Sequence, residues 1–228
     1  MESHPGLNTL YTAVREPRQP QLERSPLLIL LHGYGSDEED LLGLADHLDP
    51  RFHVLSVRAP LPLETGGNAW FPIEFTEAGL SVDYEAGDRA LEQLGKLLSS
   101  LQENLGNDGS DTFVLGFSQG GAMALGLMMS RPDDIGGVAF LSGLWSEERM
   151  PEAAARAGLQ GKPVLQTHGV DDPLIPIAAA HASRDLFQQL GVELTYREYH
   201  MGHQIDADCL REIRDWLTAR IDDQETDS

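Results

Sequence analysis

The sequence has little of several residue types, and each scarcity excludes a class of protein. Cys209 is the only cysteine among 228 residues, so no intrachain disulfide can form and no cysteine-based metal site can be built. The longest unbroken apolar run, residues 27–31, is far too short to span a bilayer. The first ten residues lack the basic start and the apolar stretch of a secretory signal. These absences lead us to expect a cytoplasmic protein without stable membrane insertion.

Positive charge is also scarce. Sixteen lysines and arginines stand against 37 aspartates and glutamates, which gives a formal net charge of −21, and only Lys96 and Lys162 are lysines. A polyanion of this size repels phosphate backbones, so we expect no nucleic-acid partner. The acidic surface has two interpretations. It is either an adaptation to a salty cytoplasm, where salt screens the self-repulsion, or an ordinary carboxylate surface that helps solubility.

What the sequence does contain is enough apolar material for a large buried core. Hydrophobic residues make up 41% of the chain and charged residues 23%, which is typical of a folded globular protein. No repeat of fixed period and no proline- or serine-rich linker divides the chain. We therefore predict a single domain over residues 1–221, followed by a polar, acidic and disordered tail at 222–228.

The hydrophobic periodicity switches repeatedly between short apolar runs and longer helical patterns. Several short runs are apolar throughout, as in strands that are buried on both faces of a parallel sheet. The clearest helix begins at Tyr84, where leucines recur at steps of three and four residues until Gly106 ends the pattern. The predicted strands cover residues 7–14, 27–32, 53–57, 112–117, 136–141, 163–168 and 193–199, and the predicted helices 38–47, 83–103, 118–130, 177–190 and 206–220. This alternation predicts an α/β fold with a mostly parallel central sheet and helices on both faces.

A G-x-S-x-G pattern spans residues 116–120, with Ser118 at its centre, where a strand pattern ends and a helix pattern begins. In a nucleophile elbow this strained turn projects the serine hydroxyl above the sheet, and the two glycines leave room for the neighbouring backbone. The helix that follows points its N-terminus at the oxygen and favours negative charge there. The pattern alone is short enough to arise by chance in a glycine-rich turn, but its position between strand and helix favours a nucleophile.

A nucleophilic serine needs a base, and in this kind of fold the acid and the histidine follow it along the chain. Asp171 and Asp172 come directly after one predicted strand, and His200 and His203 come directly after the next. Because catalytic groups of open α/β sheets gather at the carboxyl ends of the strands, both segments are expected to approach Ser118. The residues themselves leave open which aspartate and which histidine take part.

The loop after the first buried strand is expected to complete the site. It contains His32, Gly33, Tyr34 and Gly35 and precedes a helix pattern. Such a loop can turn the backbone N–H of Tyr34 toward the serine oxygen, so that it forms an oxyanion hole with the N–H of Gln119. His32 has a simpler interpretation, as a buried histidine whose ring nitrogens are hydrogen-bonded within a turn.

Four segments together resemble the phospholipase/carboxylesterase family of α/β hydrolases, which includes the acyl-protein thioesterases. They are LLHGYG at 30–35, GFSQGGAMAL at 116–125, HGVDDPLIP at 168–176 and YHMGH at 199–203. Their order and spacing hold from about residue 27 to the last predicted helix. The resemblance implies an α/β-hydrolase fold and a serine esterase that works on a small-molecule ester without a cofactor.

The resemblance also assigns roles that the spacing left open. It implies that Asp172, just before the stretch that ends in Ile-Pro, is the catalytic acid and that His203, which follows Met-Gly, is the catalytic histidine. Asp171 is then a solvated neighbour. The His-x-x-His pair of His200 and His203 could suggest a metal, but no third ligand lies near it in the sequence, and we expect no metal.

Candidates for the substrate pocket are aromatic or otherwise apolar. Trp70 and Phe71 look like an aromatic pair that the family has near its acyl site, and Met123 and Trp145 are further candidates. An apolar acyl group needs an apolar wall, which such side chains supply. Each of the four could equally be ordinary core. For Met123 the core is favoured, because most apolar residues of its helix are expected to face the sheet.

Three functions are compatible with this sequence. The leading hypothesis is a serine carboxylesterase that hydrolyses short- to medium-chain carboxylic esters through Ser118, His203, Asp172 and an acyl-enzyme intermediate. Tyr34 and residues 66–79 depart from the thioesterase branch of the family, and residues 66–79 look closer to its bacterial esterases. The nearest alternative is an acyl thioesterase or lysophospholipase, which uses the same three catalytic residues but needs a longer acyl groove. A non-catalytic binding protein with the α/β-hydrolase fold is the alternative of another class. The sequence does not determine the oligomeric state, and a homodimer is one of the possible states.

Overall fold

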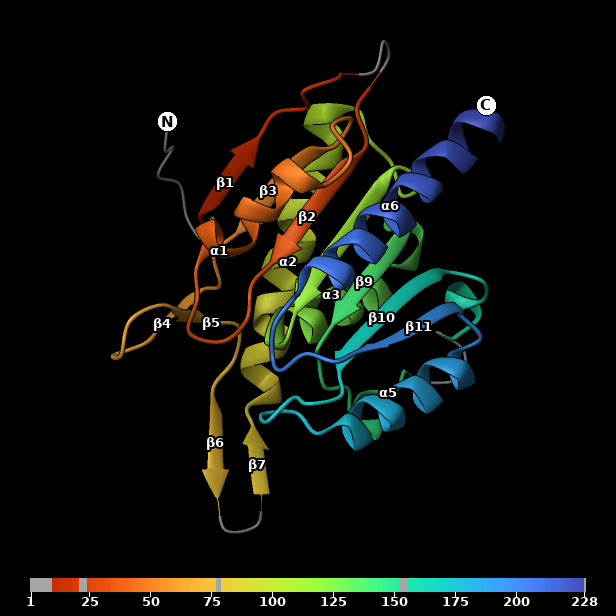
Figure 1. The fold of residues 1–228 in the computed structure, drawn as a ribbon. Coiled ribbons are helices and arrows are strands. Elements are labelled where there is room, and N and C mark those ends of the chain that lie inside the picture. The colour runs from red at the N-terminus through yellow and green to blue at the C-terminus, as the bar shows by residue number, and fades with distance from the viewer. Residues whose placement is uncertain (1–9, 21–23, 77–78, 152–155, 228) are drawn as a thin grey trace.

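The computed structural model describes residues 10–20, 24–76, 79–151 and 156–227 and is built around a seven-stranded sheet (Figure 1). The strand order is β1-β3-β2-β8-β9-β10-β11, and every neighbouring pair is parallel except β1 with β3. The strands are β1 Thr12–Arg15, β2 Leu27–Leu31, β3 His53–Val57, β8 Thr112–Phe117, β9 Gly137–Leu141, β10 Pro163–Gly169 and β11 Glu193–Tyr199. The prediction of a mostly parallel sheet is confirmed.

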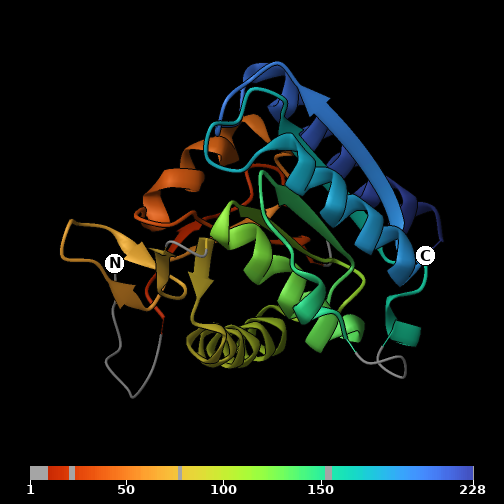
Figure 2. The same cartoon turned by 90° about the horizontal axis from the view of Figure 1, so that it is seen from below.

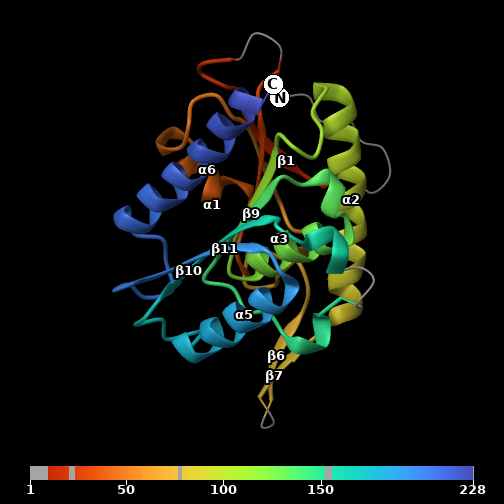
Figure 3. The same ribbon diagram turned by 90° about the vertical axis from the view of Figure 1, so that its right-hand side faces the viewer.

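Helices cover both faces of the sheet. On one face lie α2 Tyr84–Leu105, α3 Gln119–Ser130 and α5 Ile177–Leu190, and on the other lie α1 Glu38–Leu42 and α6 Ala207–Asp227. Figure 3 shows α1 and α6 on one side of the strands and α2 on the other. Short 3-10 turns occur at Gly43–His47, Pro132–Asp134, Glu147–Arg149 and Ala157–Leu159.

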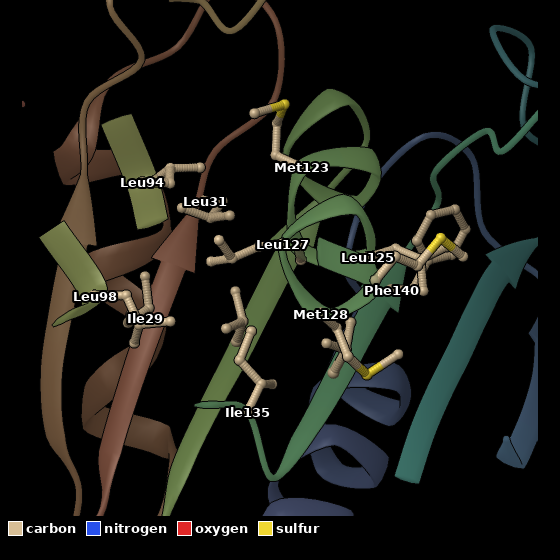
Figure 4. Close-up of a cluster of buried hydrophobic side chains, with 14 of the residues drawn as sticks. Ile29, Leu31, Leu94, Leu98, Met123, Leu125, Leu127, Met128, Ile135 and Phe140 are labelled. Carbon is tan, nitrogen blue, oxygen red and sulfur yellow. The ribbon is translucent and has the colours of Figure 1, made fainter. Parts of the chain in front are cut away.

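The strand β2 shows how the sequence builds two cores from one apolar run. All five of its residues are buried, and its side chains alternate between the faces as the pleat requires. Ile29 and Leu31 pack with α2 and α3 in one core, which Figure 4 shows, whereas Leu28 and Leu30 pack with α1 and α6 in the other. A strand of this kind has no polar face, which is why its pattern is continuous rather than alternating.

The long helix α2 begins and ends at the residues that its sequence indicates. The Asp83 carboxylate accepts a hydrogen bond from the Ala86 N–H at 2.9 Å and caps the first turn. Gly106 ends the helix with φ of +74°, a left-handed conformation that glycine adopts without strain. The helix thus ends where the leucine pattern ends, directly before Gly106, which is two residues beyond the predicted range 83–103.

The structure adds two antiparallel ribbons between β3 and α2 that the sequence patterns did not indicate. Strands β4 Leu61–Pro62 and β5 Asn68–Ala69 form one, and β6 Ile73–Thr76 and β7 Gly79–Val82 form the other, which projects from the lower end of the molecule in Figure 1. Strands of two to four residues are too short for a period of two to be recognised.

Several boundaries differ from the predictions by one or two residues, and three segments differ by more. The strand predicted at 7–14 begins at Thr12, and its first three residues lie outside the described ranges. The helix predicted at 38–47 changes to a 3-10 turn at Gly43, a residue of low helix propensity. Disorder is predicted at 222–228, but α6 continues to Asp227, and Asp222 pairs with Arg51 at 2.7 Å. Ser228 lies outside the described residues.

The strand order reverses at β2, which has β3 on one side and β8 on the other. In open α/β sheets the crevice at the carboxyl ends of such neighbouring strands is where ligands bind. The loop that contains Gly33 follows β2, and Ser118 follows β8. The topology therefore brings two of the predicted segments to one point of the sheet edge.

Candidate active site

Ser118 lies on a sharp turn between β8 and α3. Its backbone has φ of +54° and ψ of −117°, and its N–H donates to the Leu141 carbonyl of β9 at 2.8 Å. A non-glycine residue with this conformation is strained and persists only where its surroundings fix it. The two glycines of the pattern allow the turn: a Cβ on Gly116 would lie 2.1 Å from the Gly120 carbonyl oxygen, and one on Gly120 would lie 2.0 Å from that of Leu31.

His203 connects the serine to a buried carboxylate. Its Nε2 lies 3.0 Å from Ser118 Oγ, and its Nδ1 lies 2.7 Å from Asp172 Oδ2. Because the carboxylate accepts hydrogen bonds, Nδ1 carries the proton and Nε2 is free to accept from the hydroxyl. The Phe117 ring packs against the imidazole with its centroid 4.9 Å away. The three side chains come from turns after three different strands, and the structure brings them within hydrogen-bond distance.

Asp172 is held as an anion although its side chain is fully buried. Burial by itself raises the pKa of this carboxyl group. Hydrogen bonds to Oδ1 from the N–H groups of Ile175 at 2.9 Å and Leu174 at 2.8 Å, together with His203, outweigh burial and lower the pKa below its ordinary value. Residues 172–175 thus form a turn around the Asp172 carboxylate, and this turn orients Oδ2 toward His203.

The loops that carry the aspartate and the histidine are joined by their backbones. The Val170 N–H donates to the Tyr199 carbonyl at 2.9 Å, and the Asp171 N–H donates to the Met201 carbonyl at 3.2 Å. Their close approach requires a glycine, since a Cβ on Gly169 would lie 2.2 Å from the Met201 oxygen. The glycine of the His-Gly pair at 168–169 therefore allows the two loops to meet.

His168 is a site residue that our sequence reasoning did not single out. Its side chain is fully buried next to Asp172, with Nε2 2.8 Å from the Ile175 carbonyl oxygen and 3.5 Å from Asp172 Oδ2. His168 Nε2 and His203 Nδ1 therefore both lie near the same carboxylate oxygen. The signal was present in the sequence, because His168 opens the quoted motif HGVDDPLIP.

The loop after β2 lies against the serine. A Cβ on Gly33 would come within 3.4 Å of Ser118 Cβ, so glycine permits this close approach. Tyr34 follows directly and is 44% exposed. Gln119, directly after Ser118, is the first residue of α3, and its N–H has no acceptor within the helix. The N–H groups of Tyr34 and Gln119 are thus on the two segments that flank the serine.

His32 is buried, and both of its ring nitrogens are hydrogen-bonded, as the simpler interpretation expects. Nδ1 lies 2.7 Å from the Gly33 carbonyl oxygen and donates to it, and Nε2 accepts from the Ala59 N–H at 3.0 Å. Burial lowers the pKa of His32 below its ordinary value, so the ring is neutral at pH 7. A neutral His32 fixes the backbone immediately before Tyr34.

The side chain of Gln119 has a role that the sequence did not indicate. Its Oε1 accepts from the Trp70 N–H at 2.8 Å, and its Nε2 donates to the Phe71 carbonyl at 2.7 Å. The Trp70 indole in turn donates to the His32 carbonyl at 2.9 Å. These hydrogen bonds join the turn at the serine, the 70–71 segment and the end of β2 into one buried network.

The structure places three of the four pocket candidates in the core. Trp70, Met123 and Trp145 are 0, 2 and 6% exposed, which corresponds to the core alternative, and Figure 4 shows Met123 in that cluster. Phe71 is half-buried, and its ring would contact a Cβ on Gly87 of α2. A pattern of apolar residues indicates that the side chains are buried. It does not indicate whether they are buried in the core or line a substrate pocket, and for this reason the sequence could not separate the two alternatives.

Other apolar side chains are exposed on the loops at the carboxyl ends of the strands. Tyr34 follows β2, Leu144 follows β9 and is 38% exposed, and Leu174 follows β10 and is 69% exposed. Leu174 is also one of the two residues whose N–H binds Asp172. The sequence analysis missed both leucines, because single leucines in loops carry no periodic signal.

The alternative acid and histidine lie outside this arrangement. His200 Nδ1 is 3.9 Å from Asp171 Oδ2, and their side chains are 94 and 70% exposed.

No group of three or more metal-binding side chains occurs in the ranges that the structure describes. Of the helices in those ranges, none is long and apolar enough to cross a membrane.

The parallel sheet, the helices on both faces and the serine turn between β8 and α3 define the chain as an α/β hydrolase. Comparison with known proteins gives the family. The profile of the phospholipase/carboxylesterase family matches residues 11–221, and the chain belongs to that family. The predicted family and fold are confirmed.

Individual relatives are similar at modest identity. A probable carboxylesterase of rice (Oryza sativa subsp. japonica) is 26% identical over 207 residues, covering 85% of this chain and 88% of the relative. Acyl-protein thioesterase 1 of Eremothecium gossypii is 28% identical over 211 residues, covering 85% and 87%. The crystal structure of esterase PE8 superposes with a TM-score of 0.79 at 25% identity, covering 92% of this chain and 99% of the other. Together they support a hydrolase of the esterase type.

Proposed function

We propose that this protein is a serine carboxylesterase that hydrolyses short- to medium-chain carboxylic esters. The observation that carries the proposal is the continuous hydrogen-bonded chain from Ser118 Oγ through the His203 imidazole to Asp172, at 3.0 and 2.7 Å. A serine hydroxyl is a weak nucleophile unless a base takes its proton, and this arrangement provides an oriented base with a buried anion behind it.

The first half of the reaction forms an acyl-enzyme. His203 Nε2 takes the hydroxyl proton while Ser118 Oγ bonds to the ester carbonyl carbon, and Asp172 stabilises the imidazolium that results. The oxygen of the tetrahedral intermediate accepts from the N–H groups of Gln119 and Tyr34, at the N-terminus of α3 where negative charge is favoured. The C–O bond to the alcohol then breaks, and the alcohol leaves with the proton from His203.

The second half returns the enzyme to its starting state. His203 takes a proton from water, and the resulting hydroxide oxygen bonds to the acyl carbon. The bond to Ser118 Oγ then breaks, and His203 returns the proton to the serine. The carboxylic acid is released, and no cofactor takes part in either half. The N–H groups of Gln119 and Tyr34 also stabilise the oxyanion that forms when the hydroxide oxygen bonds to the acyl carbon, so one site serves both halves of the reaction.

The exposed apolar side chains support an ester with an apolar part. Tyr34, Leu144 and Leu174 lie on loops at the same edge of the sheet as the serine. Exposed apolar groups at a candidate site favour the binding of a hydrocarbon chain, because its transfer from water is favourable by about 0.8 kcal/mol per buried CH₂. We assign these three residues to the substrate-binding rim, with Phe71 as a fourth candidate.

A fluorophosphonate probe tests the proposed nucleophile. Wild-type protein is expected to be labelled at Ser118, and Ser118→Ala is expected to be unlabelled and to lose on the order of 10⁶ in kcat. Ser142→Ala is a matched control, because Ser142 also has positive φ, at +45°, and follows the neighbouring strand β9. Labelling at another residue, or full activity in Ser118→Ala, would contradict the proposal.

Substrate series separate the esterase from its alternatives. Rates on p-nitrophenyl esters from acetate to palmitate are expected to peak at short or medium chain length. A peak at palmitate, or a higher kcat/KM on acyl thioesters or lysophospholipids, would favour the thioesterase or lysophospholipase alternative. A protein that binds these compounds without labelling or turnover would be a non-catalytic member of the fold.

Two further predictions concern location and assembly. Cell fractionation would test the cytoplasmic location, and light scattering would test the homodimer.

A further inference from the structure

Residues 68–71 connect the two parts of the chain that carry the proposed oxyanion donors, and we call them the bridging segment. They comprise strand β5 and the two residues after it, and Figure 2 shows the ribbon β4–β5 in gold beside α1 in orange. One donor, the Tyr34 N–H, belongs to the loop between β2 and α1, and the other, the Gln119 N–H, is at the start of α3. The two donors are far apart in the sequence, so tertiary contacts must fix the distance between them.

The first contact of the bridging segment holds the chain after Tyr34. The Gly35 N–H donates to the Asn68 carbonyl at 2.9 Å, and the Asn68 N–H donates to the Ser36 carbonyl at 2.8 Å. The Asn68 side chain also donates to the Ser36 carbonyl, at 3.2 Å. These hydrogen bonds form an isolated antiparallel β-bridge, which fixes the backbone directly after Tyr34.

The second contact holds the chain before Tyr34. The Trp70 indole donates to the His32 carbonyl at 2.9 Å, and the two rings lie 5.6 Å apart. Trp70 is fully buried, and a buried hydrogen bond of this kind is costly to break, because neither group can turn to water instead. Tyr34 therefore lies between two anchored positions, which restricts where its N–H can point.

The third contact joins the bridging segment to the serine turn. Gln119 Oε1 accepts from the Trp70 N–H at 2.8 Å, and Gln119 Nε2 donates to the Phe71 carbonyl at 2.7 Å. The Gln119 side chain is buried, so its amide has both partners within the protein. One residue thus supplies a proposed donor through its backbone and binds the bridging segment through its side chain.

We propose that Trp70 and the side chain of Gln119 are positioning groups that fix the distance between the two oxyanion donors. The inference rests on the proposed esterase function. An oxyanion donor is effective at about 2.7–3.1 Å from the oxygen that becomes negative, and a displacement of about 1 Å can lower the rate about 100-fold. The bridging segment holds the loop of Tyr34 against the start of α3 before substrate binds. Without its contacts that loop is free to move away, while the serine, the histidine and the aspartate keep their own hydrogen bonds.

Two variants remove these contacts and leave both backbone donors in the chain. Gln119→Leu keeps the approximate size of the side chain but removes both of its hydrogen bonds, and Trp70→Phe removes the indole donor. Each is expected to lower kcat on p-nitrophenyl butyrate about 10- to 100-fold and to leave KM within about twofold of wild type, because the oxyanion exists only in the transition state. Fluorophosphonate titration to completion gives the concentration of active sites, so unfolded protein does not enter kcat. Each variant is sufficient on its own if the other does not fold.

A boronic acid tests the oxyanion site without turnover. Butylboronic acid forms a reversible bond between boron and Ser118 Oγ, and the tetrahedral, negatively charged adduct places one oxygen at the oxyanion position. Its Ki is expected to rise in each variant by about the same factor by which kcat/KM falls. A merely structural role of the bridging segment would lower Tm but would leave Ki and the kcat of the folded enzyme unchanged.

Gln102→Leu and Trp216→Phe are the matched controls. Gln102 also uses its side-chain amide for two hydrogen bonds, to Thr112 Oγ1 and to the Asp134 carbonyl, but Thr112 is at the end of β8 that lies opposite to Ser118. Trp216 is also a buried tryptophan, but it belongs to α6 and packs in the core on the other face of the sheet. Both controls should keep the wild-type kcat and Ki.

Three results would overturn the proposal. One is a wild-type kcat and Ki in both variants. Another is a lower kcat with an unchanged Ki, which would show that the oxyanion site is intact. The third is that the losses in Gln119→Leu and Trp70→Phe multiply in the double variant, because contacts that act through one segment should not be independent. A wild type that is neither labelled nor active would overturn the esterase proposal as well, whereas a labelled, active wild type with unchanged variants would overturn only this inference.

Discussion

Two acid–histidine pairs lie on the same two loops of this protein, and only one of them is built into the site. His203 and Asp172 approach to 2.7 Å, and their side chains are 14 and 0% exposed. His200 and Asp171 are separated by 3.9 Å and are 94 and 70% exposed. The residue types are identical, and the positions differ by one and three residues. Residue type and approximate position therefore do not decide which pair can do chemistry.

The surroundings of the two carboxylates explain the difference. Asp172 accepts two backbone N–H groups and is packed against His168, and these contacts hold its charged, fully buried carboxylate in place. Asp171 and His200 face solvent, where an ion pair at such a distance contributes about 1 kcal/mol or less and is screened by salt. A buried, preorganised carboxylate can stabilise the imidazolium that forms in the proposed reaction. In an exposed pair, water solvates both groups, and the carboxylate has little effect on the imidazole.

The largest expected effect separates the two histidines. His203→Gln is expected to lower kcat on a p-nitrophenyl ester by on the order of 10⁶, because Ser118 loses its base. His200→Gln, the matched control on the same loop, is expected to keep wild-type kcat. Steady-state kinetics with both variants decides this, and a large loss in His200→Gln alone would reverse the assignment.

The two aspartates should differ by less. Asp172→Asn keeps the shape of the side chain but removes its charge, so the imidazole loses its oriented acceptor, and kcat is expected to fall about 10⁴-fold. Asp171→Asn should change kcat by less than about twofold. Equal losses in the two variants would show that the buried position confers no advantage. Circular dichroism should confirm that both variants remain folded.

The packing behind Asp172 can be tested through His168. His168→Phe fills the space but removes the hydrogen bond to the Ile175 carbonyl, which lies in the turn around the carboxylate. Misplacement of Asp172 is expected to lower kcat about 10-fold and to leave KM unchanged. His168→Gln, which retains a donor, should recover part of the loss. An unchanged kcat in His168→Phe would show that the two backbone N–H groups suffice.

A pH-dependent contribution to stability is expected from His32, which unlike His200 is buried. Burial lowers the pKa of His32, so below about pH 6.5 the unfolded chain binds a proton there that the folded chain does not. The free energy of unfolding should therefore fall as the pH drops from 7 through about 6.5. Urea unfolding should show a smaller decrease for His32→Gln and an unchanged decrease for His200→Gln.

Salt is expected to act on the exposed charges rather than on the buried pair. Screening at about 1 M KCl shortens the Debye length to about 3 Å and weakens the mutual repulsion of the surface carboxylates. If the acidic surface is adapted to salt, Tm should rise by a few degrees, since about 1 kcal/mol corresponds to about 2–4 °C at this size. An unchanged or lower Tm would favour the ordinary acidic surface.

Much of the fold could be predicted because its elements have strong local patterns. The continuous apolar run of β2 and the leucine spacing of α2 each identify one element without reference to the rest. The ribbon β6–β7 and the continuation of α6 past Asp222 were not predicted. Short strands depend on their pairing partner, and the helix extension is accompanied by a contact with the distant Arg51, neither of which a local pattern contains.

Site residues divide in the same way. Ser118 could be singled out as a candidate because a glycine pattern at a strand–helix junction describes a backbone turn, which is a local property. His168 and the side chain of Gln119 were missed, because their roles come from contacts with Asp172 and with the 70–71 segment. Trp145 stays a candidate for the acyl site, and its 6% exposure within the core cluster could not be read from the sequence.

The sequence alone determined the order of the central-sheet strands and of the helices that cover them, the glycine-flanked turn at Ser118 and the family, because these depend on the spacing of residues along the chain. The tertiary structure decided which apolar side chains are core and which are exposed at the site, and it showed how His203 and Asp172 are held while their neighbours face water. Burial and hydrogen bonding are properties of residues that meet in space, and the loops after β10 and β11 meet only when the sheet has formed.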